Sequence, residues 1–439
     1  MNAHRRQLVS LAHPVYLSLL ASVASGIINT VWVSRLGGAA VAAVAVATTT
    51  ENVLLGVALV FASGTTVLVA HARGARDPAA LWAAVRGGWA LGGLVTPVVV
   101  GAGFLLRAPL ARLVLGGHGA AAPRLATAYF AISLPGMAVF FAQQLVDGIL
   151  KGTGNTRTPM RLALLANGLI LLCDPVLIHL YGVRGAAAST VLCRCVALTV
   201  GVRALVRDAQ LRTAAEAAPA EPVPAALRRT LTTGLPMSAD FTVRQGGALV
   251  LVALVARLGV PAVAGYSIAY KVMYVVTMAF YSVRQAAAIH TAHTRGAGQD
   301  AHRAIGRQAV LLAAALGLTA AVLFAATAPW IMAAFGAGPE VAHQGVLFLR
   351  CVGPYLLLMA CVVAVGGVFE GSGGAPALLR VTVLGTAVQL PLAHALGGLG
   401  LPGVCLASAL AMAVQGGVVA VLLRRARRQE GEVSLVRVA

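Results

Sequence analysis

The stretch VTVLGTAVQLPLAHALGGLGLPGVCLASALAMAVQGGVVAVLL, residues 381–423, contains no Asp, Glu, Lys or Arg. A helix that crosses a membrane needs roughly 20 mostly apolar residues, so this stretch is long enough for two of them. Glycines and a proline gather near its middle, at residues 397–403, where they mark a turn. The sequence therefore predicts two membrane-spanning helices joined by a short connection in this part of the chain.

Comparable uncharged stretches recur throughout the chain, for example at residues 125–146 and 308–339. Hydrophobic residues make up 59% of the 439 residues and charged residues only 10%, whereas soluble domains carry roughly 25% charged residues. A soluble chain needs a wetted surface however large its core, so this composition excludes a water-soluble protein. Because backbone polar groups in lipid must bond within the protein, we expect an all-α polytopic membrane protein with about twelve transmembrane helices.

Basic residues outnumber acidic ones, with 33 Lys and Arg against 13 Asp and Glu and a net charge of +20. They gather in alternate connections between the predicted helices, for example Arg203, Arg207 and Arg212, whereas the intervening connections carry few, such as Arg35. Basic connections stay in the cytoplasm, so we expect both termini there, with the chain in the plasma (inner) membrane. This pattern favours membrane lipid as a partner and argues against nucleic acid.

The sequence also repeats itself. HARGA at residues 71–75 returns as HTRGA at residues 293–297, and VSRLG at residues 33–37 returns as VARLG at residues 255–259. Two further pairs of short motifs follow in the same order. Because each repeat holds an even number of spans, the two halves have the same orientation and are related by an axis along the membrane normal.

The repeat and the charge pattern together predict how the chain is divided. We expect a first six-helix lobe at residues 1–207 and a second at residues 230–423. An Ala-, Pro- and Glu-rich segment at residues 208–229 is predicted to be a flexible cytoplasmic linker. Residues 424–439 are predicted to form a basic cytoplasmic tail.

An ordered set of motifs resembles the multidrug and toxic compound extrusion (MATE) family. In the first half these are INTVWVSRLG, AHARGARD, LKGTGNTRTPM, LCDPVLI and GVRGAAAST, and TGLPMS, FEGSGGAPALL and GLPGVCLASAL are weaker copies in the second half. The resemblance covers nearly the whole chain. It implies a two-lobed, twelve-helix antiporter, not an enzyme, that exports small organic molecules such as drugs or natural products with the help of a proton or sodium gradient.

Charged residues inside membrane spans are costly and usually face the protein interior or a water-filled cavity. Asp174 lies in the fifth predicted span directly before Pro175, which removes a helical hydrogen bond and loosens the helix beside the carboxylate. Such a carboxylate can hold a proton or coordinate a cation. By the resemblance, Asp174 also corresponds to the fifth-helix aspartate of the cation site in the first MATE lobe.

The sequence departs from the family at two neighbouring positions. Asn29 stands where one branch of the family has a first-helix aspartate, and Ile170 stands where an asparagine is expected, although Asn167 is nearby. We assign ion coupling to Asp174, Asn29 and Asn167. Because Asn29 brings no charge and Ile170 no ligand, we expect the coupling ion to be a proton rather than sodium. No metal or cofactor is expected.

Further charged residues fall inside the predicted spans. Asp240 and Arg244 are spaced i,i+4 and can pair on one helix face, either as a neutralised structural pair or as a charged cavity wall for an anionic or zwitterionic cargo. The candidate partners of Glu51 include Lys271 and Arg284, and Glu370 is predicted to be solvated near a cytoplasmic helix end. The residues assigned to a cargo cavity are Glu51, Asp240, Arg244, Lys271 and Arg284.

Two other functions stay open at this point. A lipid-linked saccharide flippase of a related superfamily would need a larger basic cavity, which Arg244, Lys271 and Arg284 could supply. A membrane-embedded enzyme would need a metal cluster, a nucleotide-binding loop or a catalytic constellation in the cytoplasmic connections. The sequence of those connections shows none of these patterns.

Overall fold

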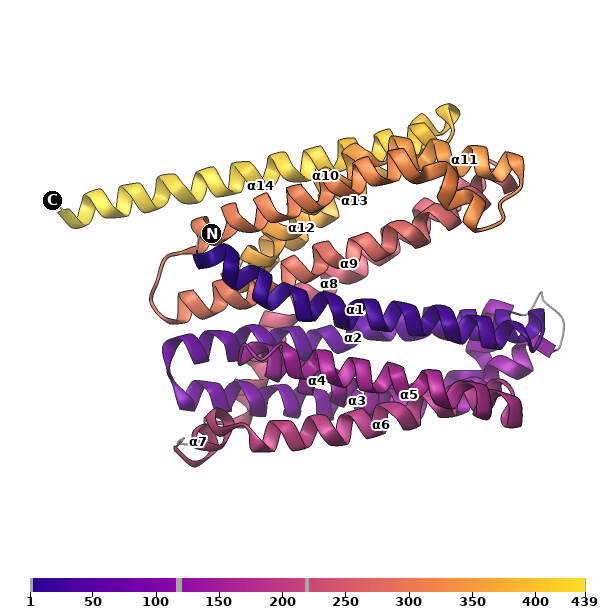
Figure 1. Cartoon of the computed structure of the whole chain (residues 1–439). Coiled ribbons are helices and arrows are strands. Elements are labelled where there is room, and N and C mark those ends of the chain that lie inside the picture. Colours follow the sequence, from indigo (N-terminus) through magenta and orange to yellow (C-terminus); the bar gives the residue numbers. More distant parts are fainter. Residues whose placement is uncertain (1–2, 116–120, 218–220, 439) are drawn as a thin grey trace. The chain divides into compact units, whose positions relative to one another are not determined.

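The computed structural model describes residues 3–115, 121–217 and 221–438, with side chains described as far as Arg424. Almost all of the described residues are helical (Figure 1). The helices are α1 (Ala3–Ser34), α2 (Gly38–Ala75), α3 (Pro78–Leu115), α4 (Ala121–Gly152), α5 (Arg157–Tyr181), α6 (Val183–Arg207), α7 (Ala209–Ala217), α8 (Val223–Ala256), α9 (Val260–Gly296), α10 (His302–Ala334), α11 (Pro339–Cys351), α12 (Gly353–Gly371), α13 (Ala375–Ala395), the 3₁₀ helix η1 (Leu396–Leu399) and α14 (Leu401–Val438).

Twelve of these helices are long and apolar enough to cross a membrane, and among the described residues the two α-helices that are not are α7 and α11. The predicted all-α fold with twelve spans is therefore confirmed. The turn predicted at residues 397–403 is the 3₁₀ helix η1 with Gly400, whose φ of 70° lies in a region that glycine adopts without strain.

The chain divides into two compact units. The N-terminal unit consists of Ser10–Ser238 together with Ala292–Asp300, and the C-terminal unit consists of Ala239–Thr291 and Ala301–Ala439 with Met1–Val9. The division falls inside α8, downstream of the predicted linker at residues 208–229. The last residues of α9 belong to the N-terminal unit, so this helix contributes to both units.

The segment predicted as a flexible linker is largely helical, which corrects that prediction. Asp208 precedes α7, and its Oδ1 accepts hydrogen bonds from the backbone N–H groups of Gln210 (3.0 Å) and Leu211 (3.4 Å). A side chain of this kind satisfies donors that the first turn of a helix leaves unpaired. Leu211 and Ala214 are buried in the same apolar cluster as Leu81 of α3, so α7 is held against the unit.

The sequence alone predicts one long span at residues 342–369, but the structure has two helices there, α11 and α12. The chain breaks at Val352, between α11 and α12, because Pro354 follows in the first turn of α12. Proline has no N–H group and clashes with the preceding turn, so it begins a helix more readily than it continues one. Hydropathy alone does not reveal this break, since both helices are apolar.

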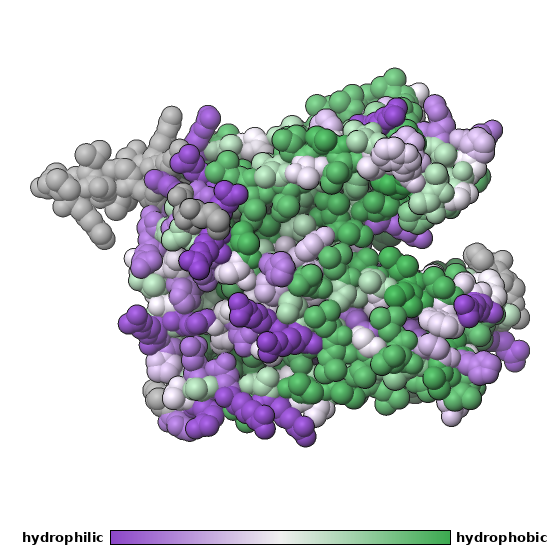
Figure 2. Space-filling view, in the orientation of Figure 1, coloured by the Kyte–Doolittle hydropathy of each residue, from purple (hydrophilic) through white to green (hydrophobic). Residues whose placement is uncertain are grey.

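Helix α2 of the N-terminal unit packs against α3 and α4. Phe61 of α2 meets Phe141 of α4 edge to face, with ring centroids 5.6 Å apart. The outer helices of this unit expose large apolar side chains, including Leu172 on α5 and Leu192 on α6. Figure 2 shows apolar side chains over the middle of these helices and hydrophilic ones toward the end that carries α7, as expected for a membrane-spanning surface.

The repeated HARG and HTRG motifs meet in the N-terminal unit. A Cβ atom added to Gly74 of α2 would lie 1.9 Å from the carbonyl oxygen of His293, and one added to Gly296 of α9 would lie 1.9 Å from the carbonyl oxygen of His71. The two helices therefore cross backbone to backbone, which glycine allows because it has no side chain. We call this reciprocal contact the glycine crossing.

We expect Gly74→Ala to destabilise the protein by roughly 1–3 kcal/mol, the usual effect of inserting a methyl group where no space exists. The matched control is Gly93→Ala, because a Cβ atom at Gly93, also inside a helix, meets nothing within 4 Å. Thermal unfolding in detergent measures the difference. Equal midpoints for the two variants would contradict the close approach of α2 and α9.

Candidate functional site

Asp174 lies in the N-terminal unit with its side chain 1% exposed. Asn29 of α1 donates a hydrogen bond from Nδ2 to Oδ2 of Asp174 at 2.9 Å. The other carboxylate oxygen, Oδ1, is buried and accepts no hydrogen bond from the described residues, although Ser189 of α6 lies beside it. Among the described residues no Lys, Arg or His forms an ion pair with this carboxylate. Two of the three residues predicted for ion coupling are thus in direct contact.

Asn167, the third residue predicted for ion coupling, makes its contacts elsewhere. Its Nδ2 donates to the carbonyl oxygen of Ala163 at 2.8 Å and lies 3.5 Å from Oγ of Ser22. Seven residues separate it from Asp174 on the same helix face, which corresponds to roughly 10 Å along the axis. Asn167 therefore contacts α1 about two helical turns away from the carboxylate.

Glu51 of α2 has a different neighbour from the one predicted. It lines a cavity of about 10 Å³ with Tyr129 and Ser133 of α4 and with Arg194 of α6. That volume fits about one water molecule, and Oγ of Ser133 is buried without a hydrogen-bond partner among the described residues. Arg284, named as a possible partner of Glu51, bonds to Asp240 and Glu370 of its own unit.

The C-terminal unit contains a buried chain of alternating charges. Glu370 of α12 accepts hydrogen bonds through Oε1 from Arg284 of α9, from Nη2 at 2.7 Å and from Nε at 3.2 Å. Nη2 of Arg284 also donates to Oδ2 of Asp240 at 2.7 Å. Asp240 in turn accepts from Nε of Arg244 at 3.1 Å and from Nη2 of Arg244 at 3.3 Å. We call Glu370, Arg284, Asp240 and Arg244 the charge chain.

Two features hold the charge chain in place. Thr382 of α13 donates from Oγ1 to Oδ1 of Asp240 and accepts from Nη2 of Arg244 at 2.9 Å. Gly367 of α12 lies against the backbone of Arg284, since an added Cβ atom would be 2.0 Å from its carbonyl oxygen. This close approach lets Glu370, one turn later on α12, reach the guanidinium group.

The predicted pairing of Asp240 with Arg244 is present, but the pair belongs to a larger network. Glu370, predicted to be solvated, is instead 7% exposed and bonded to Arg284, which is also 7% exposed. Burial of a charged side chain requires a partner, and the two arginines balance the two carboxylates. Lys271, by contrast, is exposed and does not line the pocket described next.

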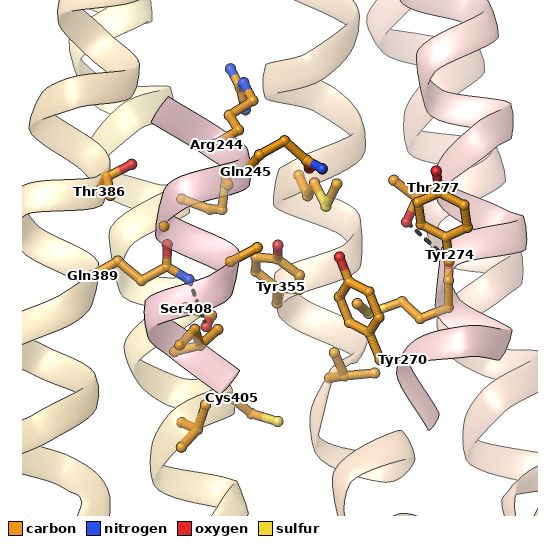
Figure 3. Close-up of a pocket in the computed structure, with 18 of the residues that line it drawn as sticks. Arg244, Gln245, Tyr270, Tyr274, Thr277, Tyr355, Thr386, Gln389, Cys405 and Ser408 are labelled. Carbon is orange, nitrogen blue, oxygen red and sulfur yellow. Dashed lines mark hydrogen bonds between the residues drawn. The ribbon is translucent and has the colours of Figure 1, made fainter. Parts of the chain in front are cut away.

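A pocket of about 120 Å³ lies beside the charge chain in the C-terminal unit. Tyrosines dominate its wall on α9, where Tyr270 and Tyr274 lie opposite Gln389 of α13 and Ser408 of α14 (Figure 3). Gln389 donates from Nε2 to Oγ of Ser408 at 3.0 Å. Other polar lining residues are Arg244, Gln245, Tyr266, Thr277, Tyr281, Tyr355, Thr382, Thr386 and Gln415.

The family profile described as MatE matches residues 14–176 and 236–394 of this chain. These two segments correspond to the two repeats and together cover most of the sequence. The chain belongs to the MatE family. The resemblance predicted from the ordered motifs is thereby confirmed, and both matched segments contain residues of the sites described above.

Relatives of this MatE chain are named as drug-resistance proteins. The probable multidrug resistance protein NorM of Deinococcus radiodurans is 26% identical over 384 residues, which are 84% of this chain and 83% of that protein. The probable multidrug resistance protein YpnP of Bacillus subtilis is 25% identical over 279 residues, 62% of this chain and 61% of that protein. The chain thus matches about three fifths of the length of YpnP.

Solved MATE structures share the fold of this MatE chain. A transporter of the MOP superfamily from Pyrococcus furiosus has a TM-score of 0.88 at 22% identity and covers 97% of this chain and 96% of its own. An outward-facing multidrug resistance MATE family transporter has a TM-score of 0.88 at 21% identity, with coverages of 96% and 95%. These similarities establish the fold.

Sequence reasoning missed the tyrosine wall of this MatE chain. Tyr266, Tyr270 and Tyr274 are spaced i,i+4,i+8, so their side chains share one face of α9. The signal was present in the sequence, because three tyrosines at this spacing stand out in a chain with only 5% aromatic residues. Tyr355 and Gln389, from other helices, could not be assigned to the same wall without the packing.

Proposed function

We propose that this chain is a secondary active transporter that exports small organic molecules across the plasma membrane in exchange for protons. Its MatE membership and its multidrug-resistance relatives support the export function, and its twelve apolar helices support the location. The basic connections support cytoplasmic termini. Neither alternative function, the lipid-linked flippase or the membrane enzyme, is favoured by the family match.

The observation that carries the proton coupling is the contact between Asp174 and Asn29. Sodium is held by oxygen atoms and is best served by several of them with negative charge. Here one oxygen of the carboxylate faces the amide nitrogen of Asn29, which is a donor, and Asn29 adds no charge. A single buried carboxylate with one donor partner suits a proton better, because protonation removes the charge that burial disfavours.

The cargo is proposed to bind in the pocket of the C-terminal unit, with Arg244 in its wall. Asp240 and Arg284 take part indirectly, by fixing the guanidinium group of Arg244. Drug-sized molecules need pockets of roughly 300–1,000 Å³, so the cavity of about 120 Å³ takes a small molecule or opens when a larger one binds. Glu51 is proposed to act with Arg194 at the small cavity of the N-terminal unit.

Purified protein in sealed vesicles tests the proposal. A fluorescent cargo is loaded, and proton and sodium gradients are imposed separately, with protein-free vesicles as the control. We expect the proton gradient to drive cargo across the membrane against its own gradient, and the sodium gradient to add nothing at constant pH. Transport that follows sodium alone would contradict the coupling, and no transport of any compound would contradict the function.

A further inference from the structure

The charge chain ends at the pocket with a positive group. Its order is Glu370, Arg284, Asp240 and Arg244, so negative and positive groups alternate and Arg244 is the terminal member. Arg244 also lines the pocket, whereas Glu370 and Asp240 do not. These four side chains together are neutral, but the member that lines the pocket is the positively charged Arg244.

Arg244 keeps hydrogen-bonding capacity for a ligand. Its Nε and Nη2 atoms are used by Asp240 and Thr382, and Nη1 has no hydrogen-bond partner among the described residues. A guanidinium group held on one side by a carboxylate and a hydroxyl group is fixed in orientation, which lowers the entropic cost of binding an anion. Among the described lining residues none is acidic, so no carboxylate competes for it inside the pocket.

The wall next to Arg244 is suited to a flat ring. The ring centroids of Tyr266 and Tyr270 are 5.8 Å apart with planes inclined by 26°, and those of Tyr270 and Tyr274 are 6.4 Å apart with planes inclined by 30°. Phe348 of α11 meets Tyr266 edge to face at 5.0 Å and closes the end of the row. Aromatic ligands bind such rows by offset stacking.

An organic cation is the competing ligand, because tyrosine faces also attract positive charge. The charge of the lining decides against it. Arg244 is the one charged residue among the described lining residues, so a cation in this pocket would meet a like charge and no carboxylate, and like charges repel strongly where water is sparse. An anion at the same place gains a charge-assisted hydrogen bond instead.

We propose that the pocket of the C-terminal unit binds small aromatic acids, with the carboxylate on Arg244 and the ring against Tyr270 and Tyr274. That these acids are cargo rests on the proposed transport function, whereas their binding does not. The cavity of about 120 Å³ is of the same order as the roughly 150 Å³ cavity that holds benzene, so its size suits one ring rather than two. The tyrosine hydroxyl groups and Gln389 line the same pocket and can bond to polar substituents on that ring.

Binding of benzoate, benzamide and benzylammonium to the full chain in detergent, measured by titration calorimetry without any gradient, tests the proposal. The three probes share one ring and differ in charge. We expect benzoate to bind about ten- to a hundredfold more tightly than benzamide, the effect of one charged hydrogen bond, and benzylammonium to bind most weakly. Benzylammonium binding as tightly as benzoate would overturn the proposal.

Three variants test whether Arg244 is the source of the preference for benzoate over benzamide. Arg244→Gln should weaken benzoate about ten- to a hundredfold and leave benzamide nearly unchanged. Lys271→Gln removes an equal charge from the exposed neighbour of Tyr270 and should change neither affinity. If Arg244→Gln does not fold, Arg244→Lys keeps the charge beside Asp240. This variant should still prefer benzoate over benzamide. It should bind benzoate several-fold more weakly than the unchanged protein does, because lysine lacks the planar guanidinium group that can donate two parallel hydrogen bonds to a carboxylate.

Unchanged benzoate affinity in a folded Arg244 variant would overturn the assignment. The vesicle experiment separates this outcome from failure of the proposed function. If benzoate binds as expected but no gradient moves any compound, the transport function is wrong and the pocket assignment holds. If a proton gradient drives other compounds while benzoate does not bind, the transport function holds and the pocket assignment is wrong.

Discussion

Asp174→Asn is expected to abolish export driven by a proton gradient while cargo binding persists. The asparagine keeps the shape of the side chain and can still contact Asn29, but it cannot take up or release a proton. Asp174 is 1% exposed and its carboxylate is 2.9 Å from Nδ2 of Asn29, so little space is left beside it for a water molecule or another side chain to carry the proton instead. Uptake into vesicles and calorimetric binding, measured on the same preparation, separate the two effects.

Glu216→Gln is the matched control for Asp174→Asn. It makes the same change from carboxylate to amide on the exposed surface of α7, outside the twelve spans, and should leave transport unchanged. Asp174→Glu keeps a titratable group and should retain part of the activity. Full gradient-driven export by Asp174→Asn would show that another acid couples transport, and Glu51 beside Arg194 would be examined next.

Arg284→Met is expected to lower the free energy of unfolding by roughly 3–5 kcal/mol, the usual result of stranding a buried charge. Arg284 bonds to both Glu370 and Asp240 at 2.7 Å. Asp240 would keep Arg244 and Thr382, but Glu370 would have no cation partner among the described residues. Methionine has a similar length and an apolar end, so the loss measures the missing charge more than missing volume.

A second change should relieve this loss. Arg284→Met combined with Glu370→Gln removes the stranded carboxylate and is expected to be more stable than Arg284→Met alone. Arg350→Met removes an exposed arginine from α11 and should change stability by less than about 0.5 kcal/mol. Additive losses in the double variant, measured by unfolding in mixed micelles, would contradict the coupling between Arg284 and Glu370.

The parts of the fold that the sequence predicted depend on local composition. Each of the twelve apolar stretches and the family motif around Asp174 is contained in a short window, and the repeat is visible as matching short motifs. The contact between Asp174 and Asn29 agrees with the family motif. The linker prediction failed because composition alone did not show that Leu211 and Ala214 would find an apolar surface on α3.

Partner choice among buried charges was harder to predict, because it depends on which helices touch. Glu370 was expected to be solvated from its place near a helix end, yet Gly367 brings α12 close enough to α9 for an ion pair. Lys271 and Arg284 were named as possible partners of Glu51 by charge alone. Its neighbour is Arg194, because α4 packs against both α2 and α6 and brings their side chains to one cavity.

The glycine crossing has a bearing on how a chain of this kind could arise. Gly74 and Gly296 occupy equivalent positions of the two repeats, and each faces the carbonyl oxygen of the histidine three residues before the other. Such a contact is isologous, the type that two identical subunits make about a two-fold axis. In a homodimer of a six-helix ancestor, one glycine codon would have supplied both halves of the interface. After a gene duplication and fusion, the two codons would be free to mutate separately, while each glycine would still depend on the other for the close contact.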